Sequence, residues 1–325
     1  MSVAARIPRA VAVLSAAALA LPAAAYVRST DARTGKALSW ATPLVPYRVS
    51  DAPSVQSPGC AATPAGDPAL DAARNAFSAW RQGCASLELV YAGRMSEIRT
   101  GLDGARENLV VFRKGWCSTN PDAAACLAAG GTGCGNTYDC FEDATPLDRA
   151  IVALTSALYE PDTGRIVNAD IEVNGWDGAG SGTPVSASTS GPAHGWYFTC
   201  DRQGGWPQCT SYGQSGCFYI DLENTLTHEV GHFIGLTHPC ELDQGTCTPA
   251  MQAVTMYPAT VPGDLAKRSL SPDDVAGLCA IYPAGGGCGC GSGGAPGAIA
   301  ALLALLALGP RRRSKRPAGG AAGTC

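Results

Sequence analysis

Basic charge, long apolar runs and closely spaced cysteine pairs are all scarce in this chain. Seven of its 23 lysines and arginines lie near the two ends, whereas all 27 acidic residues lie between them, so the central part carries a net charge of about −11. That sign argues against nucleic acid as a partner, because phosphate binding needs a basic face. The apolar stretch Ala295–Leu308 has 14 residues, short of the roughly 20 that a transmembrane helix needs. The Cys-x-x-Cys spacing of thiolate zinc sites is absent.

The first 25 residues have the pattern of a secretory signal peptide. Arg6 and Arg9 precede the apolar run Val11–Leu21, and the small residues Ala23 to Ala25 follow it. This order of basic, apolar and small residues is typical of a leader that is removed during export. We therefore predict that residues 1–25 are cleaved off and that the protein is secreted or extracellular.

The C-terminal residues have the pattern of a sorting or anchor signal. A Gly/Cys linker, 284–294, leads to a hydrophobic segment with a basic tail, 295–325. Arginines after an apolar segment stay on the cytoplasmic side of a membrane. The arrangement resembles the MYXO-CTERM signals of myxobacteria, which implies cleavage or lipid attachment at a cysteine such as Cys288 or Cys290. A plain membrane anchor is the alternative, so the sequence leaves open whether the tail is cleaved, lipidated or retained.

Cysteine usage agrees with export. Twelve of the fifteen cysteines lie in the central part, and an even number in an exported chain predicts up to six disulfides whose pairing stays open. They are Cys60, Cys84, Cys117, Cys126, Cys134, Cys140, Cys200, Cys209, Cys217, Cys240, Cys247 and Cys279.

Residues 26–283 are long enough for one domain with a good core. Hydrophobic periodicity, turn residues and capping residues divide it into predicted elements. The predicted helices are 67–82, 221–235 and 271–280, and the predicted strands are 44–49, 87–91 and 108–112, with a hairpin of 150–158 and 165–173. Two Gly-rich and Cys-containing stretches, 115–143 and 174–216, are predicted loop insertions, and long loops of this kind usually serve binding.

The densest functional signal is His228-Glu229-Val-Gly-His232-Phe-Ile-Gly235-Leu-Thr-His238, which holds three of the four histidines. Residues four apart share one face of a helix, so His228 and His232 can present two imidazoles to one metal ion. A left-handed glycine at Gly235 would turn the chain so that His238 returns as a third ligand. Three neutral nitrogens leave a fourth position open, which is the pattern of a catalytic zinc site.

Glu229 directly follows His228 and lies at the edge of the helix face that carries His228 and His232. Its carboxylate can reach a water molecule at the metal without becoming a ligand. We therefore predict one catalytic Zn²⁺ and Glu229 as the general base that takes the proton of the water and delivers it to the leaving amine.

The long histidine motif, followed by Val254-Thr-Met256-Tyr257-Pro258, resembles the metzincin zinc metalloproteases, closest to the matrixin branch. Three further segments resemble the family in the same order, namely Ala76–Trp80, Gly164–Asn174 and Leu270–Leu278. The resemblance implies an α+β or α/β domain with a twisted, mostly parallel sheet, an antiparallel edge strand, an active-site helix and a C-terminal helix.

The same resemblance implies roles for particular segments. Met256 would lie beneath the three histidines as the apolar floor of a Met-turn. Ala169–Val173 would line the cleft, where an extended peptide binds by β-augmentation. Val254–Pro258 would wall the pocket for the residue after the cut. The function implied is that of a zinc-dependent endopeptidase.

The chain also departs from the family pattern. The zinc-binding tyrosine of astacins would fall at Pro258, so Tyr257 is not counted as a ligand. His194 is the only histidine outside the motif, so the second, structural zinc of matrixins is not expected. No typical propeptide or cysteine switch is readable, which leaves the control of latency open. Acidic loops leave structural Ca²⁺ open as well, but no complete calcium loop supports it.

Two other functions are compatible with these residues. A non-catalytic surface binding or adhesion protein on a metzincin scaffold would have no need of Glu229 as a base. A zinc hydrolase for another bond, such as a cell-wall amide, would have less need of a peptide-binding edge strand. We expect a monomer that acts on a protein or peptide, with membrane contact only through its C-terminal segment. The sequence does not determine the substrate or the cleavage preference.

Overall fold

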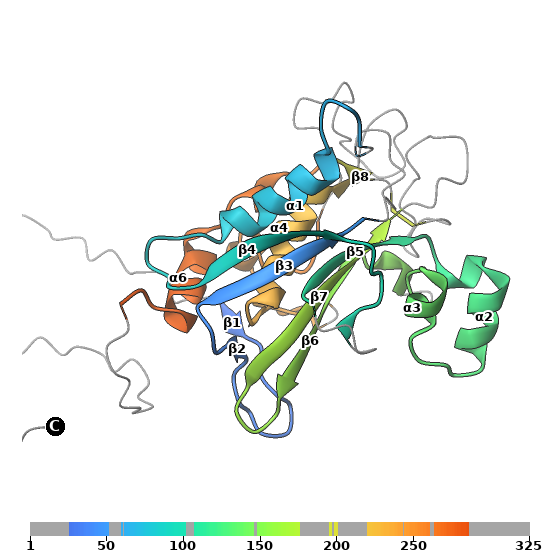
Figure 1. Cartoon of the computed structure of the whole chain (residues 1–325). Coiled ribbons are helices and arrows are strands. Elements are labelled where there is room, and N and C mark those ends of the chain that lie inside the picture. The colour runs from blue at the N-terminus through green and yellow to red at the C-terminus, as the bar shows by residue number, and fades with distance from the viewer. Residues whose placement is uncertain are drawn as a thin grey trace, which may run out of the picture. The chain divides into compact units, whose positions relative to one another are not determined.

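A six-stranded sheet is the frame of the molecule, with the strand order β2-β7-β5-β3-β4 and with β6 paired to β7 (Figure 1). This computed structural model describes residues 26–51, 60, 62–101, 107–145, 148–175, 195–196, 198–200, 220–242, 244–260 and 263–285. The strands are β1 Val27–Arg28, β2 Ser39–Trp40, β3 Leu44–Ser50, β4 Glu88–Met95, β5 Leu109–Lys114, β6 Ala153–Glu160, β7 Arg165–Gly175, β8 Phe198–Thr199, β9 Ile220–Asp221 and β10 Leu236–Thr237. The helices are α1 Pro68–Ala79, α2 Pro121–Ala128, α3 Cys134–Tyr138, α4 Leu222–Phe233, α5 Pro249–Gln252 and α6 Pro272–Ile281, and the 3₁₀ turns are η3 Cys117–Thr119, η4 Asp148–Ala150 and η5 Ala266–Arg268.

The sheet is mostly parallel, as expected from the sequence. Strand β3 pairs in parallel with β4 and β5, and β7 pairs in parallel with β2 and β5. Only β6 runs antiparallel, and it forms a hairpin with β7. The mixed α/β class and the mostly parallel sheet are therefore confirmed, and each predicted strand lies within one or a few residues of an observed one.

The position of the antiparallel edge strand corrects one expectation. Ala169–Val173 was expected to line the cleft, but it lies inside β7, with β5 on one side and β6 on the other. Its alternate residues Ala169, Ile171 and Val173 are fully buried. The free edge belongs to β6, because β7 is its partner on one side and no other described strand pairs with it.

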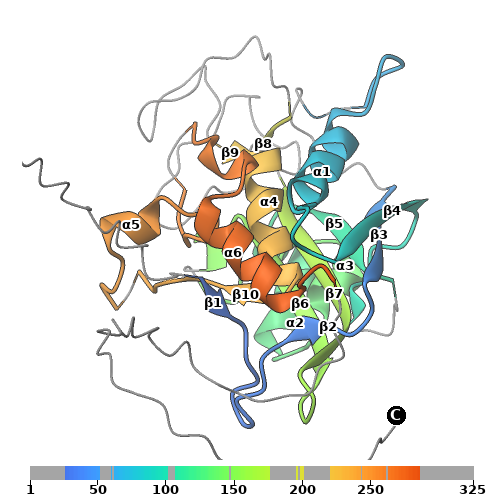
Figure 2. The same cartoon turned by 90° about the vertical axis from the view of Figure 1, so that its left-hand side faces the viewer.

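Helices α1 and α4 lie side by side on one face of the sheet (Figures 1 and 2). Each begins where the sequence predicts, because Asp67 caps α1 by accepting from the Leu70 N–H and Asp221 caps α4 by accepting from the Asn224 N–H. The two helices are joined by Trp80, which is 1% exposed and donates from Nε1 to the Thr227 carbonyl over 2.9 Å. This packing fixes the helix that carries the histidine motif.

The stretch 115–143 was expected to be a loop, but it contains η3, α2 and α3. These helices lie beyond one end of the sheet, away from α1 and α4 (Figure 1). The disulfides Cys117–Cys140 and Cys126–Cys134 close this module. Helices this short are marginal alone, and the two disulfides stabilise them. The glycines suggested a loop because local sequence does not show this stabilisation.

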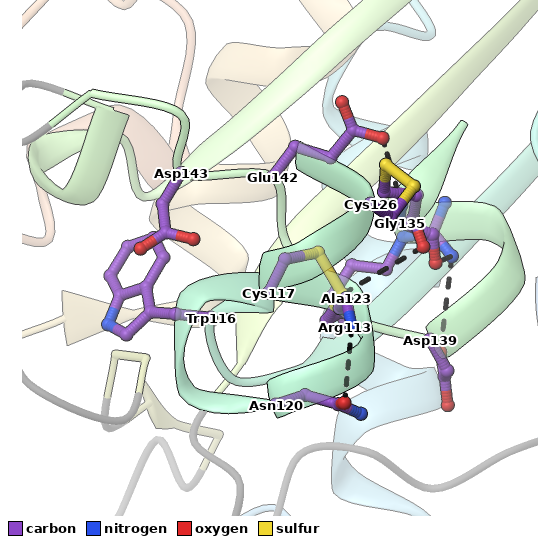
Figure 3. Close-up of a disulfide and its surroundings, with 12 residues drawn as sticks. Arg113, Trp116, Cys117, Asn120, Ala123, Cys126, Gly135, Asp139, Glu142 and Asp143 are labelled. Atoms are coloured by element: carbon purple, nitrogen blue, oxygen red, sulfur yellow. Dashed lines mark hydrogen bonds and ion pairs between the residues drawn. A yellow bond between two sulfur atoms is a disulfide. The ribbon is translucent and has the colours of Figure 1, made fainter. Parts of the chain in front are cut away.

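One buried cation ties the helical module to the sheet. Arg113 of β5 is 1% exposed and donates to the Gly135 carbonyl oxygen (Figure 3). It also donates to the carbonyl oxygen of Ile98 and to the amide oxygen of Asn136. Its Nε also pairs with the Glu172 carboxylate of β7 over 2.7 Å. The guanidinium group therefore has acceptors in the helical module and on β7, and these hydrogen bonds hold the module against β5 and β7.

The disulfides confirm the prediction drawn from the cysteine count, and the structure supplies the pairing. Besides the two in the module, Cys60 pairs with Cys200, Cys84 with Cys279 and Cys240 with Cys247. Cys209 and Cys217 lie outside the described residues. The Cys84–Cys279 link joins the end of α1 to α6 across 195 residues of sequence. Such links are compatible with an extracellular protein.

Several sequence expectations lie outside the described residues. These are the leader 1–25, most of the second insertion 174–216 with His194, and the C-terminal residues from 286 onward. Within the described part of the chain, no helix has both the length and the apolar character needed to cross a membrane.

Candidate metal centre

Helix α4 places His228 and His232 one turn apart on the same face. The helix ends at Phe233, and Gly235 then adopts a φ of 95°. A Cβ atom at Gly235 would lie 2.5 Å from the Leu38 carbonyl oxygen, so both the backbone conformation and the space require glycine here. The turn leads into β10 and brings His238 back toward the helix.

The three histidines converge at their ring nitrogens. The Nε2 atom of His238 lies 3.2 Å from Nε2 of His228 and 3.1 Å from Nε2 of His232. His228 is buried, and the other two are partly exposed. The three side chains can therefore hold one metal ion, each through a single nitrogen.

The far side of two of these rings is fixed by backbone carbonyls. His228 donates from Nδ1 to the Thr255 carbonyl over 2.7 Å, and His232 donates from Nδ1 to the Leu236 carbonyl over 3.0 Å. A carbonyl oxygen only accepts, so the proton lies on Nδ1 and the Nε2 lone pair faces the centre of the cluster. This is the arrangement that orients histidine ligands in metal sites.

Burial and nearby positive charge favour the neutral form of His228 and His238. Burial holds the pKa of His228 well below its ordinary value of 6.5, and the Lys267 cation and His232 add to the effect. Burial lowers the pKa of His238 to about 4, again with His232 and Lys267 contributing. Neutral imidazole is the form that binds a metal ion, so these two side chains are ready to bind a metal at neutral pH.

Met256 packs against α4 between the two helix histidines. Its side chain is 1% exposed, and a Cβ atom at Gly231 would lie 2.1 Å from the Met256 sulfur. The sulfur therefore occupies the space that a larger residue at Gly231 would need. This places Met256 beneath the helix surface from which His228 and His232 extend.

The N-terminus of α6 holds the turn that carries Met256. The Asp274 carboxylate is fully buried and accepts from the backbone N–H groups of Thr255, at 2.8 Å, and Met256, at 3.3 Å. It also closes the capping box with Ser271. Since the Thr255 carbonyl accepts from His228, a single hydrogen-bonded path links α6 to the first histidine.

Glu229 is 6% exposed and is positioned by the edge strand. Thr155 of β6 donates from Oγ1 to the Glu229 carboxylate over 2.6 Å, and the same hydroxyl lies 3.1 Å from the Glu229 carbonyl. The contact joins α4 to β6 and fixes the carboxylate beside the histidines. Sequence reasoning did not find this position in the groove, because the alternating pattern of a strand gives no signal for a contact with a residue 74 positions away.

A groove of about 960 Å³ lies over the three histidines, Glu229 and Thr155. One side is formed by residues 150–155 and 157 of β6 and its preceding turn, and the other by Pro258, Ala259 and Thr260. The three histidines and Glu229 line it, together with Lys267. A second hollow, between α1 and β4, contains none of the histidines.

The structure brings together the three histidines singled out in the sequence, with Glu229 in the same groove and Met256 packed against Gly231 of α4. The sequence did not identify Asp274 as a support of the Met256 turn, nor Thr155 or Lys267 as part of the groove. Asp274 carried a readable signal, since Ser271-Pro-Asp-Asp marks a helix start, but its contact with the Met256 turn depends on the fold.

No family model and no curated protein matches this chain.

Proposed function

We propose that this chain is an exported zinc-dependent endopeptidase. His228, His232 and His238 would hold the metal ion, and Glu229 would act as the general base. The single observation that carries the proposal is the convergence of three Nε2 lone pairs and one buried carboxylate in a groove bordered by the free edge of β6.

The donor set fits zinc. Tetrahedral zinc with Zn–N distances of about 2.0 to 2.1 Å requires ligand nitrogens about 3.3 Å apart. The observed separations from His238 are 3.2 and 3.1 Å. Three imidazoles without a thiolate or a fourth described ligand correspond to the ligand number of catalytic sites. When bound, zinc would supply Lewis-acid polarisation of the scissile carbonyl and acidify a water molecule.

The residues of the chain perform the remaining chemistry. The Glu229 carboxylate accepts a proton from the attacking water and later donates it to the nitrogen of the leaving amine. The Thr155 hydroxyl holds that carboxylate in place, so little freedom is lost when the reaction begins. The low exposure of Glu229 and His228 removes competing water from the reacting groups.

The shape of the groove favours an extended peptide. Strand β6 has a free edge along the groove, and an extended segment can pair with such an edge through its backbone. Leu154, which is 45% exposed, offers apolar contact on the same strand. Backbone pairing is independent of side chains, which suits an enzyme for peptide bonds better than one for a compact small molecule.

The test compares Glu229→Gln with Glu223→Gln, the same change on the same helix. Glu223 faces Asn75 of α1 rather than the metal centre. Zinc content and cleavage of a quenched-fluorescent peptide library are measured for the wild type and for both variants. We expect about one zinc in each, and a loss of about 100-fold or more in kcat only for Glu229→Gln. A zinc-loaded wild type that cuts no peptide would refute the proposal and favour a binding function.

A further inference from the structure

One buried cation in the groove has no ion-pair partner among the residues that the structure describes. Lys267 of η5 is 7% exposed and lines the groove together with His228 and Glu229. Its backbone N–H donates to the Asn224 side chain over 2.7 Å, which fixes the residue against α4. Its Nζ donates to the Tyr257 carbonyl over 2.5 Å, so the side chain reaches back toward the Met256 turn.

The charge of Lys267 is not neutralised within the described part of the chain. No described carboxylate forms an ion pair with Nζ within 4.0 Å, although Asp264, Glu229 and Asp274 attract it over longer distances. The next residue, Arg268, differs, because it is paired with the Asp221 carboxylate. Burial lowers the pKa of Lys267 to about 8, so the side chain is still largely a cation at neutral pH.

An ammonium group has three donors, and Tyr257 accepts from one of them. A buried charge without a counter-ion is costly unless a ligand supplies one. Pro258–Thr260 and the first-turn residues Asn224 and Thr225 of α4 line the same groove as Lys267. A carboxylate that enters between them would meet the remaining donors of Lys267.

We propose that Lys267 makes the groove selective for substrates with an aspartate or glutamate side chain next to the bond that is cut. This inference rests on the endopeptidase function proposed above and names its substrate class. A merely structural Lys267 would support the Tyr257 carbonyl and would be indifferent to substrate charge. The charge preference therefore separates a specificity-determining residue from a supporting one.

The experiment uses the zinc-loaded full chain and peptide pairs that differ only by Glu or Gln at each position flanking the cut. Cleavage is compared as kcat/KM, and binding of the same pairs to Glu229→Gln is measured by calorimetry. Lys267→Met removes the charge, Lys267→Arg keeps it, and Lys36→Met makes the same change on the exposed surface. Thermal denaturation verifies that each variant is folded.

We expect the wild type and Lys36→Met to prefer Glu over Gln by about 10- to 100-fold at one flanking position, as a charge-assisted hydrogen bond predicts. Lys267→Arg should retain most of this preference, and Lys267→Met should lose it. Cleavage by the wild type with equal kcat/KM for Glu and Gln peptides overturns this inference and leaves the protease function intact. Absence of both cleavage and binding for every peptide overturns the inference and the proposed function together.

Discussion

Replacing Gly231 by alanine tests whether Met256 supports the metal centre by packing. The added Cβ would lie 2.1 Å from the Met256 sulfur and 3.0 Å from Cζ2 of Trp80. Ordinary contacts between such atoms are about 3.5 to 4.0 Å, so one or both side chains must move by roughly 1 Å or more. Both are 1% exposed, and neither has free space to enter without displacing its neighbours.

Two effects of opposite sign determine the result. Overpacking of a tight core costs about 1 to 3 kcal/mol, whereas alanine favours a helix over glycine by about 1 kcal/mol. The steric term is the larger, so we expect Gly231→Ala to lower the free energy of unfolding by about 1 to 2 kcal/mol. It should also weaken zinc binding, because His228 and His232 extend from the same two turns of α4.

The assay is denaturant unfolding together with zinc competition, applied as a double-mutant cycle with Met256→Ala. Removing Met256 relieves the sulfur contact, so the double variant should be more stable than the sum of the single effects predicts, by about 1 kcal/mol. Gly83→Ala is the control, because a Cβ atom there meets nothing within 4 Å. The packing argument fails if Gly231→Ala is as stable as the wild type and the cycle is additive.

Two further predictions concern buried carboxylates. Asp274→Asn removes an acceptor from the backbone N–H groups of Thr255 and Met256. We therefore expect a loss of about 1 to 3 kcal/mol in unfolding free energy and weaker zinc binding. Unchanged zinc affinity in a competition titration would contradict the hydrogen-bonded path from α6 to His228. Burial raises the pKa of Asp170 to about 6, above its unfolded value near 3.8, so its contribution to stability is greatest below pH 4 and is lost as the pH rises to 6. The asparagine of Asp170→Asn does not titrate. The unfolding free energy of this variant relative to the wild type, measured by chemical denaturation, should therefore rise by on the order of 2 kcal/mol between pH 4 and pH 7. A difference in unfolding free energy that does not change with pH would refute this prediction.

Local sequence was sufficient to predict the helix of the metal centre and its termini. Asp221 caps α4, the spacing of His228 and His232 puts them on one face, and Gly235 has the positive φ needed to return His238. Each of these features depends on residues within a few turns of one another. The same holds for the caps of α1 and α6 and for the β6–β7 hairpin.

Segment 115–143 shows where local reasoning was insufficient. Its glycines and cysteines predicted a loop, but two disulfides and the buried Arg113 hold short helices that local propensity alone would not support. The pairing of cysteines across up to 195 residues was likewise undetermined, because loop closure depends on the whole fold and not on spacing.

The sequence by itself identified the three histidines that can hold a metal ion and the glutamate beside them, because helical periodicity and one glycine turn relate them locally. Tertiary structure decided which strand offers a free edge and placed Thr155 on the carboxylate of Glu229. It also placed Lys267 in the groove and connected Asp274 to the Met256 turn. These contacts join elements that are distant in sequence, and only the packing of helices against the sheet brings them within hydrogen-bonding distance.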